Sequence, residues 1–302
     1  MTGLSPQVLA DLVAEVGPRW QAAQHDRLTA RSRQRDVGAG GRYWLVFVDR
    51  LLATLVQLRH GVTQDVLAAW FGVHRSTISR AIGEVRPLLA ERGCAVESGV
   101  RLRTLADVIA YLGAVPQTAL MDATEIRVRR PAAGRTDRNR YTSERSRQNA
   151  VKAMVVTDRS GHILFCGHTR PGSTADVTQA RDSGLIDLLA QHPSVELLAD
   201  AGYQGLGAQT LGAVITPPHR RRKAKLPQMD WLETLHAAER KRHSSRRIRV
   251  EHGIAHLKNW RALARHHGRR DTLGTTIRAI AGLASDHQRA TRRTQQPALS
   301  AP

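Results

Sequence analysis

The sequence has little cysteine and few aromatic residues, and both shortages narrow the possible folds. Its two cysteines, Cys94 and Cys166, lie far apart and belong to no metal-binding motif, which argues against a disulfide framework and a cysteine-type zinc site. Phe, Trp and Tyr make up only 4% of the 302 residues, so a core must consist mainly of aliphatic side chains. The hydrophobic content of 41% is enough for one large domain or two smaller ones.

Long apolar runs and acidic residues are also scarce. No apolar stretch is long enough to cross a bilayer, and the N-terminal segment lacks the basic and apolar regions of a signal peptide, so we expect a cytoplasmic protein without membrane contact. Only 26 Asp and Glu oppose 46 Lys and Arg, which gives a net charge of +20. Such a charge attracts polyanions, because binding to phosphates releases their condensed counterions. Double-stranded DNA is the predicted partner.

The pattern of apolar residues changes near residue 115, which predicts two domains. Before this point apolar residues recur at helical spacing, and after it strand-like segments such as 118–128 and 150–157 alternate with helical ones. The predicted fold is α/β. It has an all-helical domain over 1–114, a mixed sheet flanked by helices over 115–290, and a disordered tail over 291–302.

Residues 63–82 follow the order helix, glycine turn, helix that is typical of a helix-turn-helix. Thr63 is a good N-cap for the first helix, in which Val66, Leu67 and Trp70 are predicted to face the core. The second helix would then expose an edge that suits the major groove of DNA. That edge consists of Arg75, Ser76, Thr77 and Arg80. The alternative is an ordinary helical hairpin with a solvated polar face.

Three acidic residues occupy unusual positions. Asp122 and Asp200 each follow an apolar strand-like segment, and Glu251 lies in a predicted helix that is rich in arginine. If the two strands are neighbours, their carboxylates repel each other, and a divalent cation such as Mg²⁺ resolves that conflict. Taken singly, the aspartates could instead belong to ordinary turns, and Glu251 could form a structural ion pair.

Several basic residues accompany Glu251 on its helix. Arg247 and Lys258 lie at i−4 and i+7 from Glu251, near one stripe, where they could hold a scissile phosphate. His252 and His256 are spaced as a possible zinc pair, but no glutamate separates them as in the zinc-protease motif. Phosphate contact or packing is the preferred interpretation of both. The basic run 220–225 is interpreted as a contact with the DNA backbone.

Four segments together resemble a known family. They are MDATEIRV around Asp122, PGSTADVTQAR over 171–181, LLADAGYQG around Asp200, and RRIRVEHGIAHLKNWRAL around Glu251. In this order they resemble the DDE-superfamily endonuclease transposases of bacterial insertion sequences, the Harbinger-like group. The resemblance covers roughly residues 40–285, including the helix-turn-helix.

The resemblance implies an RNase H-like catalytic domain that uses Mg²⁺ or Mn²⁺, with two ions expected. Carried over position by position, it makes Asp122, Asp200 and Glu251 the catalytic and metal-binding residues. Asp176 falls within a matching motif as a supporting residue rather than a ligand, and Glu125 and Tyr203 fall within matching motifs, which places them near the site. It further implies a homo-oligomer on DNA and a bacterial cytoplasmic protein associated with the nucleoid. The sequence departs from the family pattern at Asn149, where a histidine is usual, and at Glu144 among basic residues.

Three interpretations of function remain open at this stage. The first is a transposase that binds element ends, cleaves phosphodiester bonds and transfers strands. The second is a helix-turn-helix regulator, or a decayed transposase copy, that binds DNA without cutting it. The third is another RNase H-like nuclease that acts on structured DNA or RNA. Dependence on a metal ion separates the regulator from the two enzymes.

Overall fold

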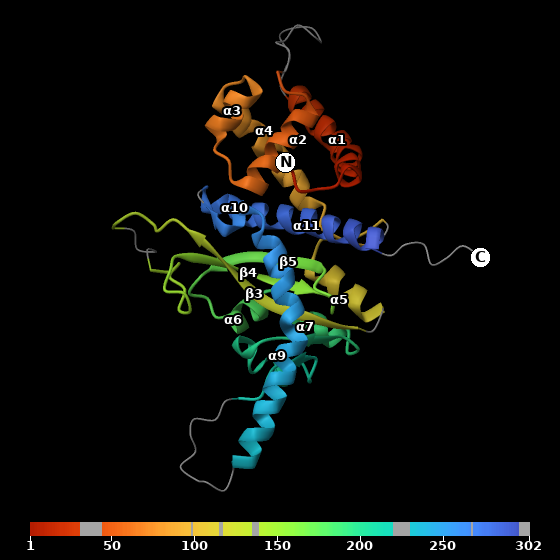
Figure 1. The fold of residues 1–302 in the computed structure, drawn as a ribbon, viewed down its shortest axis with the longest axis vertical. Coiled ribbons are helices and arrows are strands. Elements are labelled where there is room, and N and C mark those ends of the chain that lie inside the picture. The colour runs from red at the N-terminus through yellow and green to blue at the C-terminus, as the bar shows by residue number, and fades with distance from the viewer. Residues whose placement is uncertain are drawn as a thin grey trace, which may run out of the picture.

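The computed structural model describes residues 1–30, 44–97, 99–114, 117–134, 139–219, 230–266 and 268–295. The chain begins with a bundle of helices and continues into a mixed sheet that is covered by helices (Figure 1). The last helix, α11 (Leu273–Gln295), returns to pack between the bundle and the sheet. No helix among the described residues combines the length and apolar character needed to span a bilayer.

Four helices form the N-terminal bundle: α1 (Pro6–Thr29), α2 (Phe47–His60), α3 (Gln64–Phe71) and α4 (Arg75–Glu91). The Ser5 side chain caps α1 by accepting a hydrogen bond from the Val8 amide at 3.3 Å, and Thr63 caps α3 in the same way. Gly61 and Gly72 end α2 and α3 with positive φ angles of 65° and 62°. A left-handed residue at these two places costs little only when it is glycine.

Helices α3 and α4 form the predicted helix-turn-helix, but the buried face of α3 is not the predicted one. Leu67 is fully buried as expected, together with Ala68. Val66 and Trp70 were predicted to face the core and are instead 56% and 50% exposed. The reason is that α3 has only eight residues, so its apolar positions surround most of the helix and do not define one face.

Along the chain, the bundle is followed by a two-stranded hairpin and a helix, and then by the sheet. The hairpin pairs β1 (Cys94–Glu97) with β2 (Val100–Leu102), and the helix is α5 (Leu105–Ala114). The sheet itself contains β3 (Thr118–Val128), β4 (Ala150–Thr157), β5 (Ile163–Pro171), β6 (Glu196–Leu198), β7 (Val214–Ile215) and β8 (Arg265–His266).

The strand order is β5-β4-β3-β6-β7, with β8 paired to the far end of β3. Strands β3, β4 and β5 are antiparallel neighbours, whereas β6 runs parallel to β3 and β7 runs parallel to β6. Three antiparallel strands followed by two parallel ones give the RNase H-like arrangement, which confirms the predicted fold class.

Short helices connect the second half of the sheet: α6 (Asp176–Asp182), α7 (Leu185–Gln191), the 3₁₀ turn η1 (Ala201–Tyr203) and α8 (Leu206–Gln209). The long helix α9 (Asp230–Lys258) then crosses the sheet and extends beyond it at its N-terminal end (Figure 1). It is followed by α10 (Arg261–Ala264), β8 and the turn η3 (Arg270–Thr272) before α11 begins.

One apolar cluster joins the two parts of the chain. It includes Leu12 of α1, Leu89 of α4, Val155 of β4 and Ile280 of α11. Because this core is shared, we propose 1–114 and 115–290 as sequence divisions of one packed unit. Helix α11 extends to Gln295, into the segment that the sequence assigned to a tail. Residues 296–302 and the basic run 220–225 lie outside the described residues.

Candidate active site

Strand register brings Asp122 and Asp200 together. Leu120 of β3 pairs with Leu198 of β6 in a parallel ladder, and each aspartate lies two residues beyond its leucine. Neighbouring strands lie about 4.8 Å apart, and residues two apart share a face of the sheet. The two carboxylates therefore occupy equivalent positions on adjacent strands. Leu120 and Leu198 pack with Val250 of α9, so the aspartates lie on the face that α9 covers.

A third carboxylate, Asp176 at the start of α6, borders the same place. A Cβ atom added to Gly202 would lie 2.9 Å from Asp176 Oδ2 and 3.0 Å from Asp200 Oδ1. The Gly202 amide donates a 2.8 Å hydrogen bond to Asp200 Oδ1, which caps the η1 turn. The carboxylates of Asp176 and Asp200 thus lie against Gly202. A residue with a side chain at this position would push them away, because its Cβ would be too close to both oxygens.

Helix α9 contributes a cation to the cluster. Its buried positions, His243, Arg247, Val250 and Leu257, recur at helical spacing and face the sheet. Arg247 Nη2 lies 3.1 Å from Asp122 Oδ2 in an ion pair that is largely buried. His243 Nε2 lies 2.7 Å from the Ala199 carbonyl oxygen, one residue before Asp200. These two contacts fix α9 against the middle of β3 and the carboxyl end of β6.

The electrostatics of Asp122 reflect its burial among like charges. Burial raises the pKa of Asp122 to about 6, the Arg247 guanidinium opposes this rise, and Asp200 and Asp176 add to it. Tyr203 is fully buried nearby, and its hydroxyl has no hydrogen-bond partner among the described residues. Burial, followed by the charges of Asp176, Asp122 and Asp200, raises the pKa of Tyr203 well above its usual value. Its hydroxyl therefore stays protonated and can donate to an oxygen.

Glu251 does not join this cluster in the structure. It lies one turn after Arg247 on α9, is exposed, and forms no hydrogen bond or ion pair with any described residue. Lys258, His252 and His256 are exposed on the same helix. Among the described residues, no three His, Cys, Asp or Glu side chains are placed to hold one metal ion. The structure therefore groups Asp122 and Asp200 with Asp176. Glu251 lies outside this group, exposed on α9.

A polar network extends the cluster along β3 and β4. Lys152 Nζ lies 3.1 Å from Asp176 Oδ1 and 3.8 Å from Glu125 Oε1. Glu125 accepts hydrogen bonds from Ser143 Oγ at 2.6 Å and Ser146 Oγ at 2.9 Å. The sequence interpretation assigned no role to Lys152. Its place at the cluster follows from the register of β3 and β4, in which Lys152 lies opposite Glu125.

The predicted DNA-reading edge of α4 is accessible. Arg75, Ser76 and Arg80 are exposed and Thr77 is half-buried, while Ile78 between them is fully buried. Arg75 Nε is 3.6 Å from Asp65 Oδ1, an exposed pair that contributes little to stability. Arg247, predicted as a DNA contact, is buried and paired with Asp122 in the structure, and its contact with DNA stays a prediction.

We expect Asp122→Asn to change how the stability of the metal-free protein depends on pH. A carboxyl group with a raised pKa contributes stability at low pH that is lost as pH rises to about 6. Wild type should therefore lose stability relative to the variant as the pH rises from about 4 to 6. Thermal melts in EDTA across this range measure the difference, and parallel curves would contradict the raised pKa.

Two protein families match segments of the chain. Residues 121–284, more than half of the chain, match the DDE superfamily endonuclease family. The chain belongs to the DDE superfamily of endonucleases. Residues 45–95 match the helix-turn-helix of DDE superfamily endonucleases, so the N-terminal bundle carries the DNA-binding domain of this family. The family predicted from the sequence is confirmed, and the Harbinger-like subgroup stays a prediction.

Individual relatives are more distant. A candidate transposase for insertion sequence element IS112 of Streptomyces albus G is 26% identical over 264 residues, which cover 87% of this chain and 83% of the relative. Among solved structures, a pre-cleavage Mos1 transpososome is 15% identical, with 90% of this chain and 86% of that chain covered and a TM-score of 0.23. A Mos1 strand transfer complex is 13% identical, with coverages of 90% and 85% and a TM-score of 0.21. The fold assignment rests on the strand order and not on these scores.

Proposed function

We propose that this DDE superfamily endonuclease is a transposase. It would bind the ends of its element through α3 and α4, hydrolyse phosphodiester bonds there and join the freed 3′-hydroxyls to target DNA. The observation that carries the proposal is the equivalent position of Asp122 and Asp200 on adjacent parallel strands. The resemblance to the IS112 protein supports the same activity.

The carboxylate cluster suits divalent metal ions, and we propose Mg²⁺ or Mn²⁺, two ions in all. The raised pKa of Asp122 marks a surplus of negative charge that a hard cation would relieve. Asp122 and Asp200 are the proposed ligands, and Glu251 the third. Such ions activate a water or a 3′-hydroxyl and stabilise the leaving oxygen.

The remaining residues would position the DNA. Arg247 pairs with Asp122, and it can turn to a scissile phosphate when another positive charge neutralises that aspartate. Tyr203 can donate its unpaired hydroxyl to a carboxylate or phosphate oxygen at the cluster. Lys258 and the edge of α4, Arg75, Ser76, Thr77 and Arg80, would contact the duplex outside the cluster. Because two element ends must be joined to one target, we further propose that the active form is at least a dimer.

The second candidate is a DNA-binding regulator, or a decayed copy that no longer cuts. The exposed position of Glu251 favours it, because no contact among the described residues joins that side chain to Asp122 or Asp200. This alternative predicts specific DNA binding that no divalent metal converts into cleavage.

The deciding experiment is cleavage of a supercoiled plasmid that carries the terminal repeats flanking the coding sequence. We expect wild-type protein to cut at the repeat ends in Mg²⁺ or Mn²⁺ and to leave the plasmid intact in EDTA, because the carboxylates alone cannot activate a nucleophile. A plasmid without the repeats is the matched control. Tight binding to the repeats without any metal-supported cutting would reject the transposase in favour of the regulator.

A further inference from the structure

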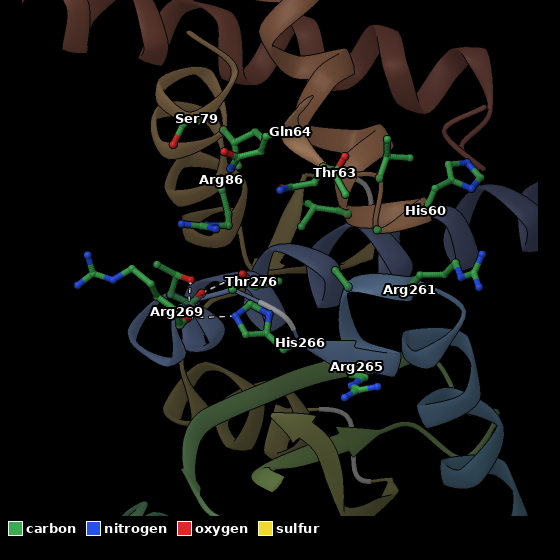
Figure 2. Close-up of a pocket in the computed structure, with 18 of the residues that line it drawn as sticks. His60, Thr63, Gln64, Ser79, Arg86, Arg261, Arg265, His266, Arg269 and Thr276 are labelled. Carbon is green, nitrogen blue, oxygen red and sulfur yellow. Dashed lines mark hydrogen bonds between the residues drawn. The ribbon is translucent and has the colours of Figure 1, made fainter. Parts of the chain in front are cut away.

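A large groove separates the helix-turn-helix from the end of the catalytic domain (Figure 2). Its volume is about 1050 Å³, at the upper limit of small-molecule pockets. One wall comes from α3 and α4, including Thr63, Ser79 and Arg86, and the other from the α10–β8–η3 segment. The walls meet at one end, where a Cβ added to Gly61 would lie 3.6 Å from Arg261 Cβ.

The lining of the groove is strongly basic. Among the described residues that line it, six are arginines and one, Asp65, is acidic. The six are Arg75, Arg86, Arg129, Arg261, Arg265 and Arg269. Pockets for small apolar ligands have the opposite character, with mostly hydrophobic walls and a few polar groups.

Most of this positive charge is not neutralised within the protein. Among the described residues, Arg129, Arg261 and Arg265 form no ion pair. Arg75 pairs with Asp65 and Arg269 pairs with Asp271, and both ion pairs are exposed to solvent. Arg86 is half-buried, and its Nε has no hydrogen-bond partner among the described residues. Burial lowers the pKa of Arg86 and the more distant charge of Asp271 opposes this, so a nearby anion would favour the charged form.

The groove is continuous with the DNA-reading edge. Arg75 belongs both to the exposed edge of α4 and to the groove wall, so a duplex bound at this edge would lie next to the groove. At the other side, Arg265 of β8 pairs with Arg127 of β3. Asp122 lies five residues before Arg127, about 17 Å along an extended strand, which corresponds to about five base pairs of duplex.

We propose that this groove binds the phosphate backbone of the duplex next to the segment that α4 reads, through Arg86, Arg129, Arg261, Arg265 and Arg269. It would hold the DNA between the recognition helix and the carboxylate cluster, and so set the distance from the recognised sequence to the cut. The proposal rests on the proposed function for the identity of the duplex. Its tests measure binding without metal, so they are independent of cleavage.

The first test compares the salt dependence of binding for two matched double variants. Arg261→Gln with Arg265→Gln removes two groove charges, and Arg103→Gln with Arg293→Gln removes two exposed charges outside it that form no ion pair with any described residue. The probe is a duplex of about 40 base pairs that carries a terminal repeat, in EDTA. Each lost phosphate contact lowers the slope of log K against log salt by about 0.9, so we expect a decrease of about 2 units for the groove variant. Its Kd at 50 mM salt should rise about ten-fold or more, against less than about three-fold for the control.

An unchanged slope and Kd for the groove variant would overturn the proposal, whether or not the wild type cuts DNA. A change in self-association with unaltered DNA binding would also overturn it, and would reassign the groove to a contact between subunits. Conversely, a reduced slope together with failure to cut in Mg²⁺ would leave the groove established and reject only the transposase.

A second test maps the contact directly. Both native cysteines are buried, and burial raises the pKa of the Cys94 thiol to about 12, so neither reacts readily. Ala264 is exposed and lines the groove, and Ala10 is exposed on α1 outside it. A photocrosslinker on Ala264→Cys should attach to the duplex within a few base pairs of the repeat, and the same reagent on Ala10→Cys should not. Equal labelling from both positions would contradict a specific backbone contact.

Discussion

Asp122→Asn and Asp200→Asn should each reduce cleavage at the repeat ends by about 10³-fold or more while leaving binding to the repeats intact. An amide cannot replace an anionic metal ligand, and the metal ion contributes several kcal/mol to the transition state. Every 1.36 kcal/mol corresponds to ten-fold in rate. Single-turnover cleavage in Mg²⁺ and binding in EDTA separate the two effects, since both side chains lie far from the edge of α4.

The informative comparison is Glu251→Gln against Asp176→Asn. If Glu251 is the third ligand, its variant should match the losses at Asp122 and Asp200, whereas Asp176→Asn should cost less because Lys152 already pairs with that carboxylate. A larger loss of cleavage for Asp176→Asn than for Glu251→Gln would assign the third ligand to Asp176. The closeness of Asp176 and Asp200 around Gly202 supports that assignment. Equal cutting by wild type and all four variants would mean that this cluster is not the active site.

Arg92→Met should destabilise the protein by about 3 kcal/mol, a large share of the stability of an ordinary domain. Arg92, at the end of α4, is 1% exposed and bonds to Asp286 of α11 at 2.7 Å and Glu15 of α1 at 2.8 Å. Its loss leaves Asp286 buried, with Arg101 at 3.2 Å as its remaining ion-pair partner among the described residues. This remaining pair places the expected cost at the lower end of the range for a broken buried ion pair. Urea denaturation at pH 7 measures it.

The matched control for Arg92 is Arg19→Gln, which breaks the exposed pair of Arg19 with Glu91 between the same two helices, α1 and α4. It should cost no more than about 1 kcal/mol. Burial tends to raise the pKa of Glu15, but Arg92 and Arg101 hold it below its usual value. Stability from such a group is present above about pH 4 and is lost below it, so the difference between wild type and Arg92→Met should shrink in acid. A difference that is independent of pH would argue for packing and not charge.

Local sequence patterns were sufficient where a residue's environment is set by its own strand or helix. Asp122 and Asp200 could be paired because each comes after a short apolar run, and the parallel pairing of β3 with β6 places the two runs side by side. Thr63 and Gly72 located the helix-turn-helix through their capping roles. The hairpin of β1 and β2 was missed, because three or four residues per strand are too few to establish an alternating pattern.

The rest depended on contacts between distant parts of the chain. Nothing local to Tyr203 indicates that its hydroxyl lies among three aspartates, since α6 and η1 must first pack together. The sequence also could not indicate that Arg247 would neutralise Asp122 and leave Glu251 exposed. The groove arginines come from three separate segments, α4, the end of β3 and the α10–β8–η3 segment, so their charge gathers only in the folded chain.

The ion pair between Arg92 and Asp286 has a consequence for synthesis, because its partners are 194 positions apart. At about 5–20 residues per second, a ribosome needs roughly 10–40 s to make the chain between them. During that time the nascent protein already contains both helices of the DNA-binding motif, but α11 has not arrived to anchor the end of α4. A product truncated before Asp286 would keep the sequence of the DNA-reading helix and lose the buried partner that orients it. We therefore expect α4 to dock firmly on the catalytic domain only in chains that have been synthesised into α11, past Asp286.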